Sequence, residues 1–335
     1  MEPSTQIVAI GHALVDVLSN TDDDHVASLG LGKGTMTLID DDQSQKIYAG
    51  LGPAVEASGG SAANTAACLA SLGASVQFIG KVADDDLGVV FSHDIRAAGV
   101  RFEAPPFDSG HPTERQISTG ISLIMVTPDA EKTMCTNLGI GSYLAAEDID
   151  TAAIASAQIV YFEGYLCGKD ESRSGVEAAI AAARAGATLV ALSASDPAWV
   201  DLHRDELWSL LDRVDILFAN EAEALGLSGQ PTLEGALDAL AARVSTVAVT
   251  LGAEGCVVHD RTGVVRVPAE PVGQVVDTTG AGDSFAAGFM FGMVSGRPAA
   301  DCARLGGLAA AEVVGHLGAR PLARLSEMAA AVGMA

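Results

Sequence analysis

The sequence predicts an α/β fold in which a mostly parallel central sheet is flanked by helices, with a small β-sheet added to it. Short apolar strands alternate with helical segments along most of the chain, which is typical of a parallel sheet covered on both faces. Between residues 100 and 139 no helical period appears, and the strand-like stretches TGISLIMVT and KTMCTNL follow one another. A chain of 335 residues is long enough for a large unit with a smaller appendage.

The N-terminal part contains two strand–helix pairs. Residues 7–11 are expected to form a buried strand. Residues 61–72 combine small and apolar residues at helical spacing and stop at Gly73, a residue type favoured just after a helix end. Residues 75–80 are again strand-like, and residues 89–98 are expected to form the next helix.

From residue 148 onward, helix and strand alternate regularly. We expect helices over 152–157, 176–185, 205–211 and 233–244, followed in turn by strands over 158–166, 187–195, 215–220 and 246–252. After these elements we expect a hairpin over 255–269 with its turn at 260–263, and two Ala/Gly-rich helices over 283–295 and 299–314. Ligands of such sheets bind beyond the carboxyl ends of the strands.

The net charge excludes some classes of partner. The chain has 43 acidic and 19 basic residues, which gives a formal charge of −24. Such a surface repels nucleic acid and anionic membranes, so neither is an expected partner. A phosphate site in this chain must be local and made of backbone N–H groups, a metal ion and one or two cations.

The cysteines and the apolar segments indicate a cytoplasmic protein. No two cysteines have C-x-x-C spacing, and we expect buried free thiols rather than a zinc site. They are Cys68, Cys135, Cys167, Cys256 and Cys302. No stretch reaches about 18 uninterrupted apolar residues, so neither a signal peptide nor a membrane span is expected.

Several common nucleotide and hydrolase motifs are absent. GLGKGT at residues 30–35 contains a lysine, but glycine follows it where the P-loop needs Ser or Thr. No G-x-G-x-x-G fingerprint, H-E-x-x-H, G-x-S-x-G or H-R-D is present. These absences disfavour a dinucleotide oxidoreductase and a hydrolase.

Four stretches follow one another along the chain. They are GGSAANTAACLASLGASVQFIGKVADDDLG at residues 59–88, VDILFANEAEA at 214–224, TLGAEG at 250–255 and DTTGAGDSFAAGF at 277–289. Together they resemble the ribokinase-like (PfkB) family of sugar and nucleoside kinases. The first is similar to the N-terminal signature of that family, the second to its N-x-x-E segment, the third to its ATP loop and the fourth to its C-terminal signature.

Within this family the sequence is most similar to adenosine kinases. The pieces GHALVDV, STGISLIMVTPD, TMCTNLG and YFEGYL carry that similarity, whereas His12 and Met36 stand where those enzymes often have Asn and Gln. The resemblance implies a single ribokinase-like unit over residues 1–335, either monomeric or homodimeric. Parts of 12–50 and 100–140 would form a small β-sheet lid, and the remainder would form the large domain.

The C-terminal signature contains the candidate catalytic group. Backbone N–H groups at a helix start bind anions, and glycines let a phosphate approach closely. Gly280, Ala281 and Gly282 would therefore cradle the transferred phosphate, and Asp283 would accept the proton of the attacking hydroxyl. The alternative is an acid that only complements the helix dipole.

The resemblance also implies a set of substrate-binding residues. Asp16, Gly60 and Asn64 resemble the residues that hold substrate hydroxyls, because a carboxylate accepts from a diol and an amide both donates and accepts. Their alternatives are a turn acid and helix-capping residues. An apolar slot for a base, with core packing as the alternative for each member, is expected from Ile121, Leu123, Met134 and Tyr165.

A further set resembles the ATP-binding residues of the family. Thr250, Gly252 and Gly255 resemble the loop around ATP, and the alternative is an ordinary hairpin turn. Lys132 stands where this family often has a phosphate-contacting Arg, although a lysine cannot bind a phosphate bidentately.

Two pairs of residues resemble cation sites. Asn220 and Glu223 resemble the residues near ATP that hold Mg²⁺ through water, and Mg²⁺ often keeps several of its waters. The alternative is that NEAEA only caps a helix. Asp277 and Thr279 resemble contributors to a K⁺ loop in some relatives.

The sequence therefore predicts an ATP- and Mg²⁺-dependent kinase that phosphorylates the 5′-hydroxyl of adenosine to give AMP, by in-line transfer with Asp283 as general base. One alternative is a sugar kinase for fructose, ribose or 2-keto-3-deoxygluconate, which a more polar and basic lid would favour. Another is a nucleoside-binding regulator without catalysis, which the presence of Asp283, Asn220 and Glu223 argues against.

Overall fold

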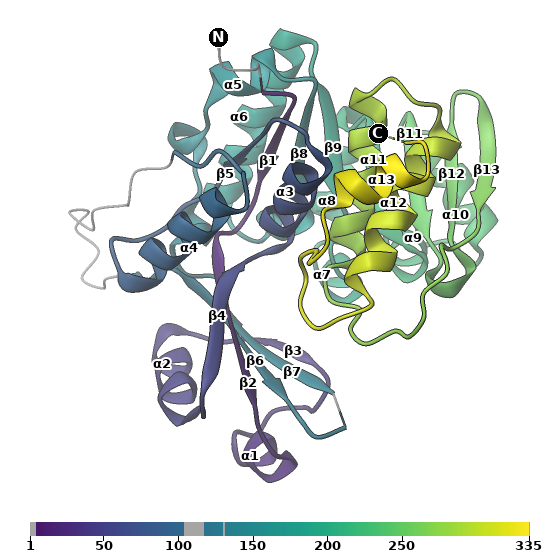
Figure 1. The fold of residues 1–335 in the computed structure, drawn as a ribbon. Helices are drawn as coiled ribbons and strands as arrows, with labels where there is room; N and C mark the ends of the chain where they lie inside the picture. The colour runs from purple at the N-terminus through teal and green to yellow at the C-terminus, as the bar shows by residue number, and fades with distance from the viewer. Residues whose placement is uncertain (1–4, 104–116, 130, 335) are drawn as a thin grey trace.

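A computed structural model of the chain, which describes residues 5–103, 117–129 and 131–334, contains a large α/β body and a smaller sheet that projects from it (Figure 1). The body is built on an eight-stranded sheet and the projection on a five-stranded sheet. The predicted α/β arrangement with an added small β-sheet is thus confirmed.

The large sheet is parallel except at one edge. Its strand order is β13-β12-β11-β10-β9-β8-β1-β5, and the pairings from β11 to β5 are parallel while β12 and β13 form an antiparallel hairpin. The strands are β1 (Ile7–Ile10), β5 (Val76–Ile79), β8 (Ile159–Glu163), β9 (Leu189–Ser193), β10 (Ile216–Asn220), β11 (Thr246–Thr250), β12 (Cys256–Asp260) and β13 (Gly263–Val267).

Helices cover both faces of this sheet. In β8, Tyr161 packs into one hydrophobic cluster and its neighbour Phe162 into the other, and both are fully buried. Such strands contain almost no polar residues, because both of their faces are buried.

The helices divide between the two clusters. The first face carries α3 (Ser61–Leu72), α4 (Asp86–Ala97), α11 (Ala281–Val294), α12 (Ala299–Val313) and α13 (Leu325–Ala331). The second carries α5 (Thr151–Ser156), α6 (Asp170–Gly186), α7 (Pro197–Leu202), α8 (Arg204–Leu210), α9 (Glu221–Ser228) and α10 (Leu233–Ala241). Helix α3 ends as predicted at Gly73, whose φ of 98° is the left-handed conformation that glycine adopts without strain.

The small sheet is assembled from distant parts of the chain. Its strand order is β3-β7-β6-β2-β4, with two helices beside it. These elements are β2 (Leu14–Asn20), α1 (Asp23–Ser28), β3 (Met36–Leu38), α2 (Asp41–Gly50), β4 (Ala54–Gly59), β6 (Gly120–Val126) and β7 (Lys132–Asn137). The chain therefore leaves the large sheet after β1 and returns to the body at α3.

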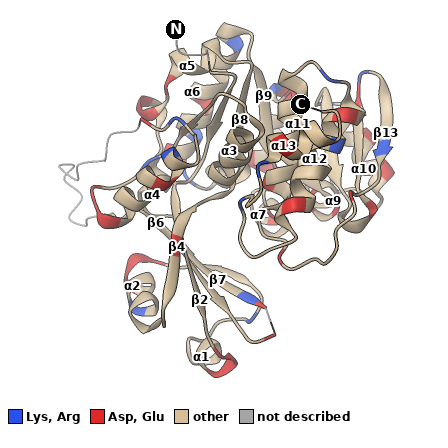
Figure 2. Cartoon of the chain, in the orientation of Figure 1, with Lys and Arg blue, Asp and Glu red and all other residues tan. Residues whose placement is uncertain are grey.

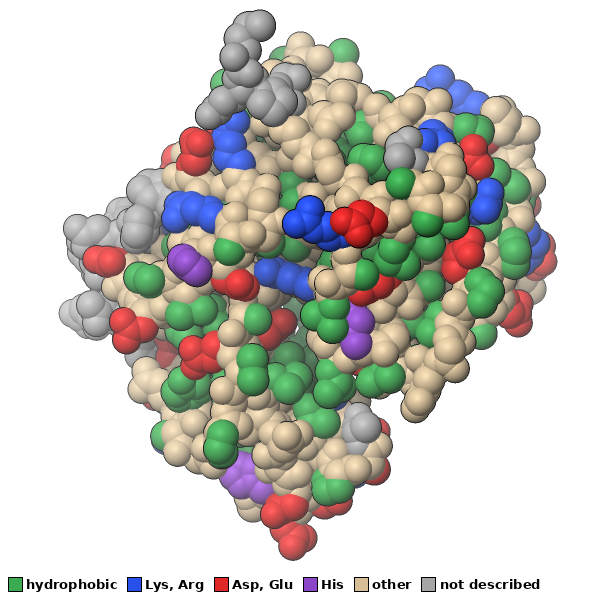
Figure 3. Space-filling view, viewed as in Figure 1, with side chains coloured by type: hydrophobic (Ala, Val, Ile, Leu, Met, Phe, Trp, Pro, Cys, Tyr) green, Lys and Arg blue, Asp and Glu red, His purple; other side chains and the backbone are tan. Residues whose placement is uncertain are grey.

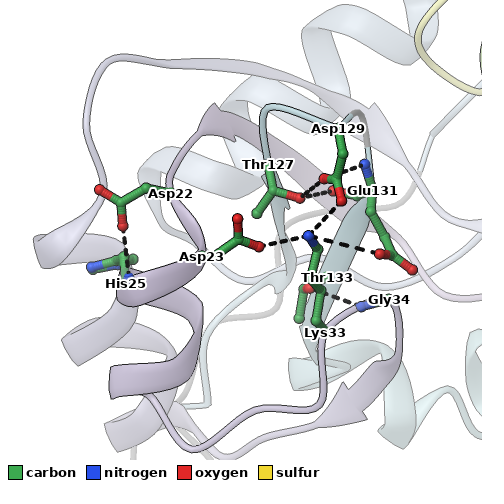
Figure 4. A network of polar contacts seen from close by, with 9 residues as sticks. All are labelled: Asp22, Asp23, His25, Lys33, Gly34, Thr127, Asp129, Glu131 and Thr133. Carbon is green, nitrogen blue, oxygen red and sulfur yellow. Dashed lines mark hydrogen bonds and ion pairs between the residues drawn. The ribbon is translucent and has the colours of Figure 1, made fainter.

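A polar network stabilises the tip of the small sheet (Figure 4). The Lys33 ammonium lies 2.6 Å from a carboxylate oxygen of Asp23 and 2.6 Å from one of Asp129, and 3.8 Å from Glu131. The Thr133 hydroxyl accepts a hydrogen bond from the backbone N–H of Gly34. These contacts join the segment before β3 to the β6–β7 hairpin.

The acidic residues are distributed over both parts of the molecule (Figure 2). The cysteines are buried and free, as the sequence predicts. No helix within the described ranges has the length and apolar character that a membrane crossing requires.

Candidate active site

A cavity of about 1100 Å³ lies between the small sheet and the carboxyl ends of the large-sheet strands. Hydrophobic side chains gather where the small sheet meets the body, around a hollow (Figure 3). Glu163, Ser193, Asn220 and Thr250, the last residues of four neighbouring parallel strands, all line this cavity. Because single-ligand pockets span roughly 300–1,000 Å³, this cavity has room for more than one small ligand.

Asp283 lies in the first turn of α11 and lines the cavity. Its Oδ1 accepts a hydrogen bond of 2.6 Å from the hydroxyl of Ser61, and its Oδ2 lies 3.5 Å from the amide nitrogen of Asn64. Helix α11 packs against α3, which supplies both donors, and against α12. The carboxylate is therefore held from the α3 side, with the cavity on its other side.

Three carboxyl groups that line the cavity have raised pKa values. Burial raises the pKa of Asp283 to about 7, although the hydrogen bond from Ser61 acts in the opposite direction and lowers it. Burial likewise raises the pKa of Asp16 to about 6 and that of Glu223 to about 7. A carboxyl group that titrates near neutral pH is suited to accept a proton and release it again.

The turn before Asp283 leaves two backbone donors free. Gly280 caps α11 with φ 77°, and the Ala281 N–H donates to the carbonyl of Thr278. The N–H groups of Gly282 and Asp283 have no acceptor among the residues that the structure describes. The donors available for the predicted anion cradle are therefore the N–H groups of residues 282 and 283, while the N–H of Ala281 stabilises the turn itself.

The structure brings the predicted hydroxyl-binding residues to this cavity. Asp16 comes from the middle of β2, Gly60 caps α3 with φ 97°, and Asn64 lies one turn into α3. A side chain at Gly59 would collide with the Asp16 carboxylate, and one at Gly60 with the carbonyl oxygen of His12. The glycine pair thus lets the end of β4 and the start of α3 lie close to Asp16 and His12.

A buried acid–histidine pair lies beside these residues. Glu163 Oε1 accepts from the backbone N–H of His12 at 2.9 Å and lies 2.6 Å from His12 Nδ1, and its Oε2 accepts from the N–H of Ala62 at 2.8 Å. Glu163 and His12 are 1% and 2% exposed. Both line the cavity, so this carboxylate fixes the orientation of the imidazole ring there.

The structure corrects the predicted apolar slot. Ile121 and Leu123 do not line the cavity but pack into the hydrophobic core, while their neighbours Ser122 and Ile124 line it. Successive side chains of a strand point to opposite faces, so the prediction was out of phase by one residue. The remaining apolar lining from the small sheet and from the residue that follows β7 is Leu14, Met36, Leu38, Met134 and Leu138.

The predicted ATP-loop residues also line the cavity. Thr250 ends β11, and Gly252 begins the short 3₁₀ turn over Gly252–Glu254. Gly255 has φ 92°, and a side chain there would meet the backbone of Pro268 and Ala269 at 2.5 Å. Tyr165, predicted for the base slot, also lines the cavity and packs against Trp199 with ring centroids 5.4 Å apart.

Asn220 and Glu223 form a reciprocal cap at the start of α9. The Asn220 side chain accepts from the Glu223 N–H, and the Glu223 carboxylate accepts from both the backbone N–H and the side-chain amide of Asn220. Within residues 5–103, 117–129 and 131–334, no group of three or more His, Cys, Asp or Glu is arranged to hold a metal ion directly. The oxygen donors that face the cavity fit Mg²⁺ bound through its own waters.

Lys132 lies in a place that the sequence did not predict. It does not line the cavity, and its ammonium donates to Asp277 Oδ2 and lies 3.4 Å from the Thr279 hydroxyl. Asp277 does not line the cavity either, whereas Thr279 does. The predicted phosphate clamp and the predicted K⁺ ligands are thus in contact with one another.

Sequence reasoning missed Ser61, Glu163 and Arg320. Arg320 donates from Nε to Asn64 Oδ1 at 3.1 Å, which turns the amide nitrogen of Asn64 toward Asp283. Ser61 and Glu163 had a usable signal, since Ser61 follows a glycine pair at a helix start and Glu163 ends a buried strand. Arg320 had none, because its partner is 256 residues away.

Comparison with known proteins gives a consistent result. The model of the pfkB family of carbohydrate kinases matches residues 4–324. A solved adenosine kinase from Sinorhizobium meliloti is 44% identical, covers 98% of this chain and 100% of its own, and superposes with a TM-score of 0.90. A probable sugar kinase from Rhizobium etli CFN 42 is 38% identical over 99% of both chains, with a TM-score of 0.91. An ATP-dependent ribose-1-phosphate kinase from Halopiger xanaduensis is 35% identical over 240 residues, 70% of this chain and 73% of its own.

Proposed function

The chain belongs to the pfkB family of carbohydrate kinases, whose members transfer a phosphoryl group from ATP, with Mg²⁺, to a hydroxyl group, and we propose that its acceptor is the 5′-hydroxyl of adenosine. The ribokinase-like fold and the kinase class follow from the family. The choice of adenosine rests on the lining of the cavity and on the similarity to the solved adenosine kinase.

The observation that carries the proposal is that an apolar wall, formed by side chains of the small sheet, stands beside hydrogen-bonding groups in the same cavity. The small sheet contributes apolar side chains, among them Ile124 and Met134, that suit a flat purine ring. Asp16, from β2 of the small sheet, and Asn64, from α3 of the body, supply the polar groups that suit the vicinal hydroxyls of a ribose. A free sugar would leave the apolar wall without a partner.

The proposed chemical step is a direct in-line transfer. The 5′-oxygen forms a bond to the γ-phosphorus of ATP while the bond from that phosphorus to the bridging oxygen breaks, releasing ADP. Asp283 Oδ2 accepts the hydroxyl proton, while its Oδ1 is held by Ser61. The free N–H groups of Gly282 and Asp283 would stabilise the charge on the transferred phosphoryl group.

Mg²⁺ would be held near Asn220 and Glu223 through water, and its contribution is to neutralise phosphate charge. The roles of this chain's own groups are separate. Glu223 fixes the start of α9 through its cap with Asn220. Thr250 and the glycines of the following turn line the half of the cavity in which the nucleotide would lie.

A phosphorylated or free sugar is the second candidate acceptor. The ribose-1-phosphate kinase of Halopiger xanaduensis supports it. A ribosyl group could make the same contacts with Asp16 and Asn64, and only the use of the apolar wall would differ.

ADP release with ATP and Mg²⁺ should be measured for adenosine, inosine, guanosine, ribose, fructose, 2-keto-3-deoxygluconate and ribose 1-phosphate. We expect the highest kcat/KM with adenosine. The variant Asp283→Asn should lose at least roughly 10³-fold in kcat with little change in KM, because a general base acts in the transition state. Turnover with sugars alone would refute the adenosine assignment, and near-normal turnover by the variant would refute the role of Asp283.

A further inference from the structure

The loop before α11 is organised by one buried carboxylate. Asp277 is 7% exposed. Its Oδ1 accepts from the N–H of Thr279 at 3.0 Å and from its hydroxyl at 2.7 Å. Its Oδ2 accepts from the N–H of Gly318 at 2.8 Å and from the ammonium of Lys132. Burial disfavours the charged form of Asp277, but these hydrogen bonds outweigh burial and lower its pKa below the usual value.

One of these four donors, the Lys132 ammonium, comes from the small sheet, whereas the loop itself belongs to the body. Thr279 and Gly318 belong to the body, whereas Lys132 is the first residue of β7 in the small sheet. The Lys132 side chain is 11% exposed, so its charge is largely withdrawn from water. This ammonium therefore spans from the small sheet to the loop that leads into the phosphate turn.

The contact is next to the proposed anion cradle. Thr279 directly precedes Gly280, the cap of α11, and the free N–H groups follow at residues 282 and 283. The backbone carbonyl of Ala319 packs where a side chain of Gly280 would lie, so the segment around Gly318 supports the turn from behind. The position of Asp277 thus affects the position of the donors.

Asp277 and Thr279 do not fit an added monovalent cation in this arrangement. A bound K⁺ would need their oxygens as ligands, yet Oδ2 of Asp277 and the hydroxyl of Thr279 already face the Lys132 ammonium. A second cation among the same oxygens would be repelled by this ammonium at short range. A lysine ammonium is itself a compact single charge with three donors, comparable in charge to the ion.

We propose that Lys132 acts as a built-in cation, whose ammonium holds the Asp277 loop, and through it the phosphate turn, in place of a bound monovalent metal ion. The enzyme should accordingly work without K⁺. Lys132 is a positioning residue in this account, because it touches the loop rather than the reacting atoms. Only the activity measurement that tests this proposal depends on the proposed phosphoryl transfer.

The test compares wild-type protein, Lys132→Ala and Lys33→Ala in KCl and in tetramethylammonium chloride at equal ionic strength. Lys33 is a matched control, since it is also a lysine of the small-sheet part paired with carboxylates, at the far tip (Figure 4). We expect wild-type protein and Lys33→Ala to show kcat values within about twofold in the two salts. Lys132→Ala should lose roughly tenfold or more in tetramethylammonium and recover severalfold in K⁺.

Thermal unfolding without substrates supplies a second readout. If K⁺ enters the space left by the ammonium, the Tm of Lys132→Ala should rise with K⁺ but not with tetramethylammonium, because a ligand of the folded state stabilises it. The Tm of wild-type protein should be the same in both salts. This readout does not depend on the acceptor, so it separates failure of this proposal from failure of the proposed function.

Two results would overturn the proposal. One is strong K⁺ activation of the wild-type protein. The other is a Lys132→Ala variant whose kcat and Tm both ignore K⁺ while its KM for ATP rises, which would make Lys132 a direct phosphate contact instead.

Discussion

A methyl group added at two positions of the phosphate turn should have opposite effects on stability. Gly280 has φ 77°, and a Cβ there would lie 2.5 Å from the carbonyl oxygen of Ala319 and 2.7 Å from its Cα. Gly282 has an ordinary φ, and a Cβ there would have no heavy atom within 4 Å. The fold therefore requires glycine at position 280. At position 282 the fold would accept a side chain, and only the close approach of a ligand would require glycine.

The expected loss for Gly280→Ala can be estimated. A left-handed conformation costs a non-glycine residue roughly 1–2 kcal/mol, and overpacking against backbone adds about 1–3 kcal/mol. The free energy of unfolding should fall by about 2–5 kcal/mol. An unfolding entropy of about 2.1 cal/mol/K per residue converts this, for 335 residues, to a Tm decrease of roughly 3–7 °C.

Gly282→Ala should behave differently. Its Tm should equal or slightly exceed that of the wild-type protein, since alanine is favoured over glycine in a helix by about 1 kcal/mol. Its kcat/KM for ATP should nevertheless fall at least about tenfold, because the methyl group would stand where a phosphate approaches the N–H groups of residues 282 and 283. Thermal unfolding and steady-state ADP release at varied ATP concentration measure both effects.

Two outcomes would refute this reasoning. Wild-type kinetics in Gly282→Ala would show that no phosphate approaches the turn closely. An unchanged Tm in Gly280→Ala would show that the contact with Ala319 and the left-handed conformation impose no constraint.

Two further predictions concern groups that hold the site. Ser61→Ala removes a hydrogen bond that lowers the pKa of Asp283 from an otherwise higher value. Because the base must be ionised, kcat/KM of the wild-type protein should decline below about pH 7. In the variant, this acidic decline of the pH profile should begin roughly one pH unit higher. If the decline stays at the same pH, it belongs to a group other than Asp283. Glu163→Gln keeps one oxygen acceptor and places an NH₂ group against the donors of either His12 or Ala62, so urea unfolding should show a loss of roughly 3–5 kcal/mol. The exposed Glu131→Gln serves as its control and should change stability by less than about 0.5 kcal/mol; equal effects of the two substitutions would contradict the structural role of Glu163.

The main elements of the large sheet could be predicted because their signals are local. Residues 7–11 are a short apolar run, residues 75–80 contain Val, Phe and Ile in a strand-like stretch, and the helix over residues 61–72 ends at a glycine as the pattern indicates. The small sheet was harder to predict. Strand β4, Ala54–Gly59, lies outside the predicted lid segments and is mostly exposed along its length, so it lacks the apolar pattern of a buried strand.

The errors in the site have physical causes. Strand β6, Gly120–Val126, is buried at every position, so its sequence shows no alternation that could reveal which side chains face the cavity. Lys132 and Asp277 are 145 residues apart, and only the fold shows that the small sheet reaches the phosphate loop. The Asp283 stretch could be found because an acid that directly follows a glycine turn is a contiguous pattern.

The most direct test of the central claim is a competition assay in which adenosine and ribose 1-phosphate are supplied together at equal concentration with ATP and Mg²⁺. The phosphorylated products are then identified by mass and by ³¹P NMR. The account predicts AMP, phosphorylated at the 5′-position, as the main product. A phosphorylated sugar as the main product, with adenosine left unchanged, would contradict it.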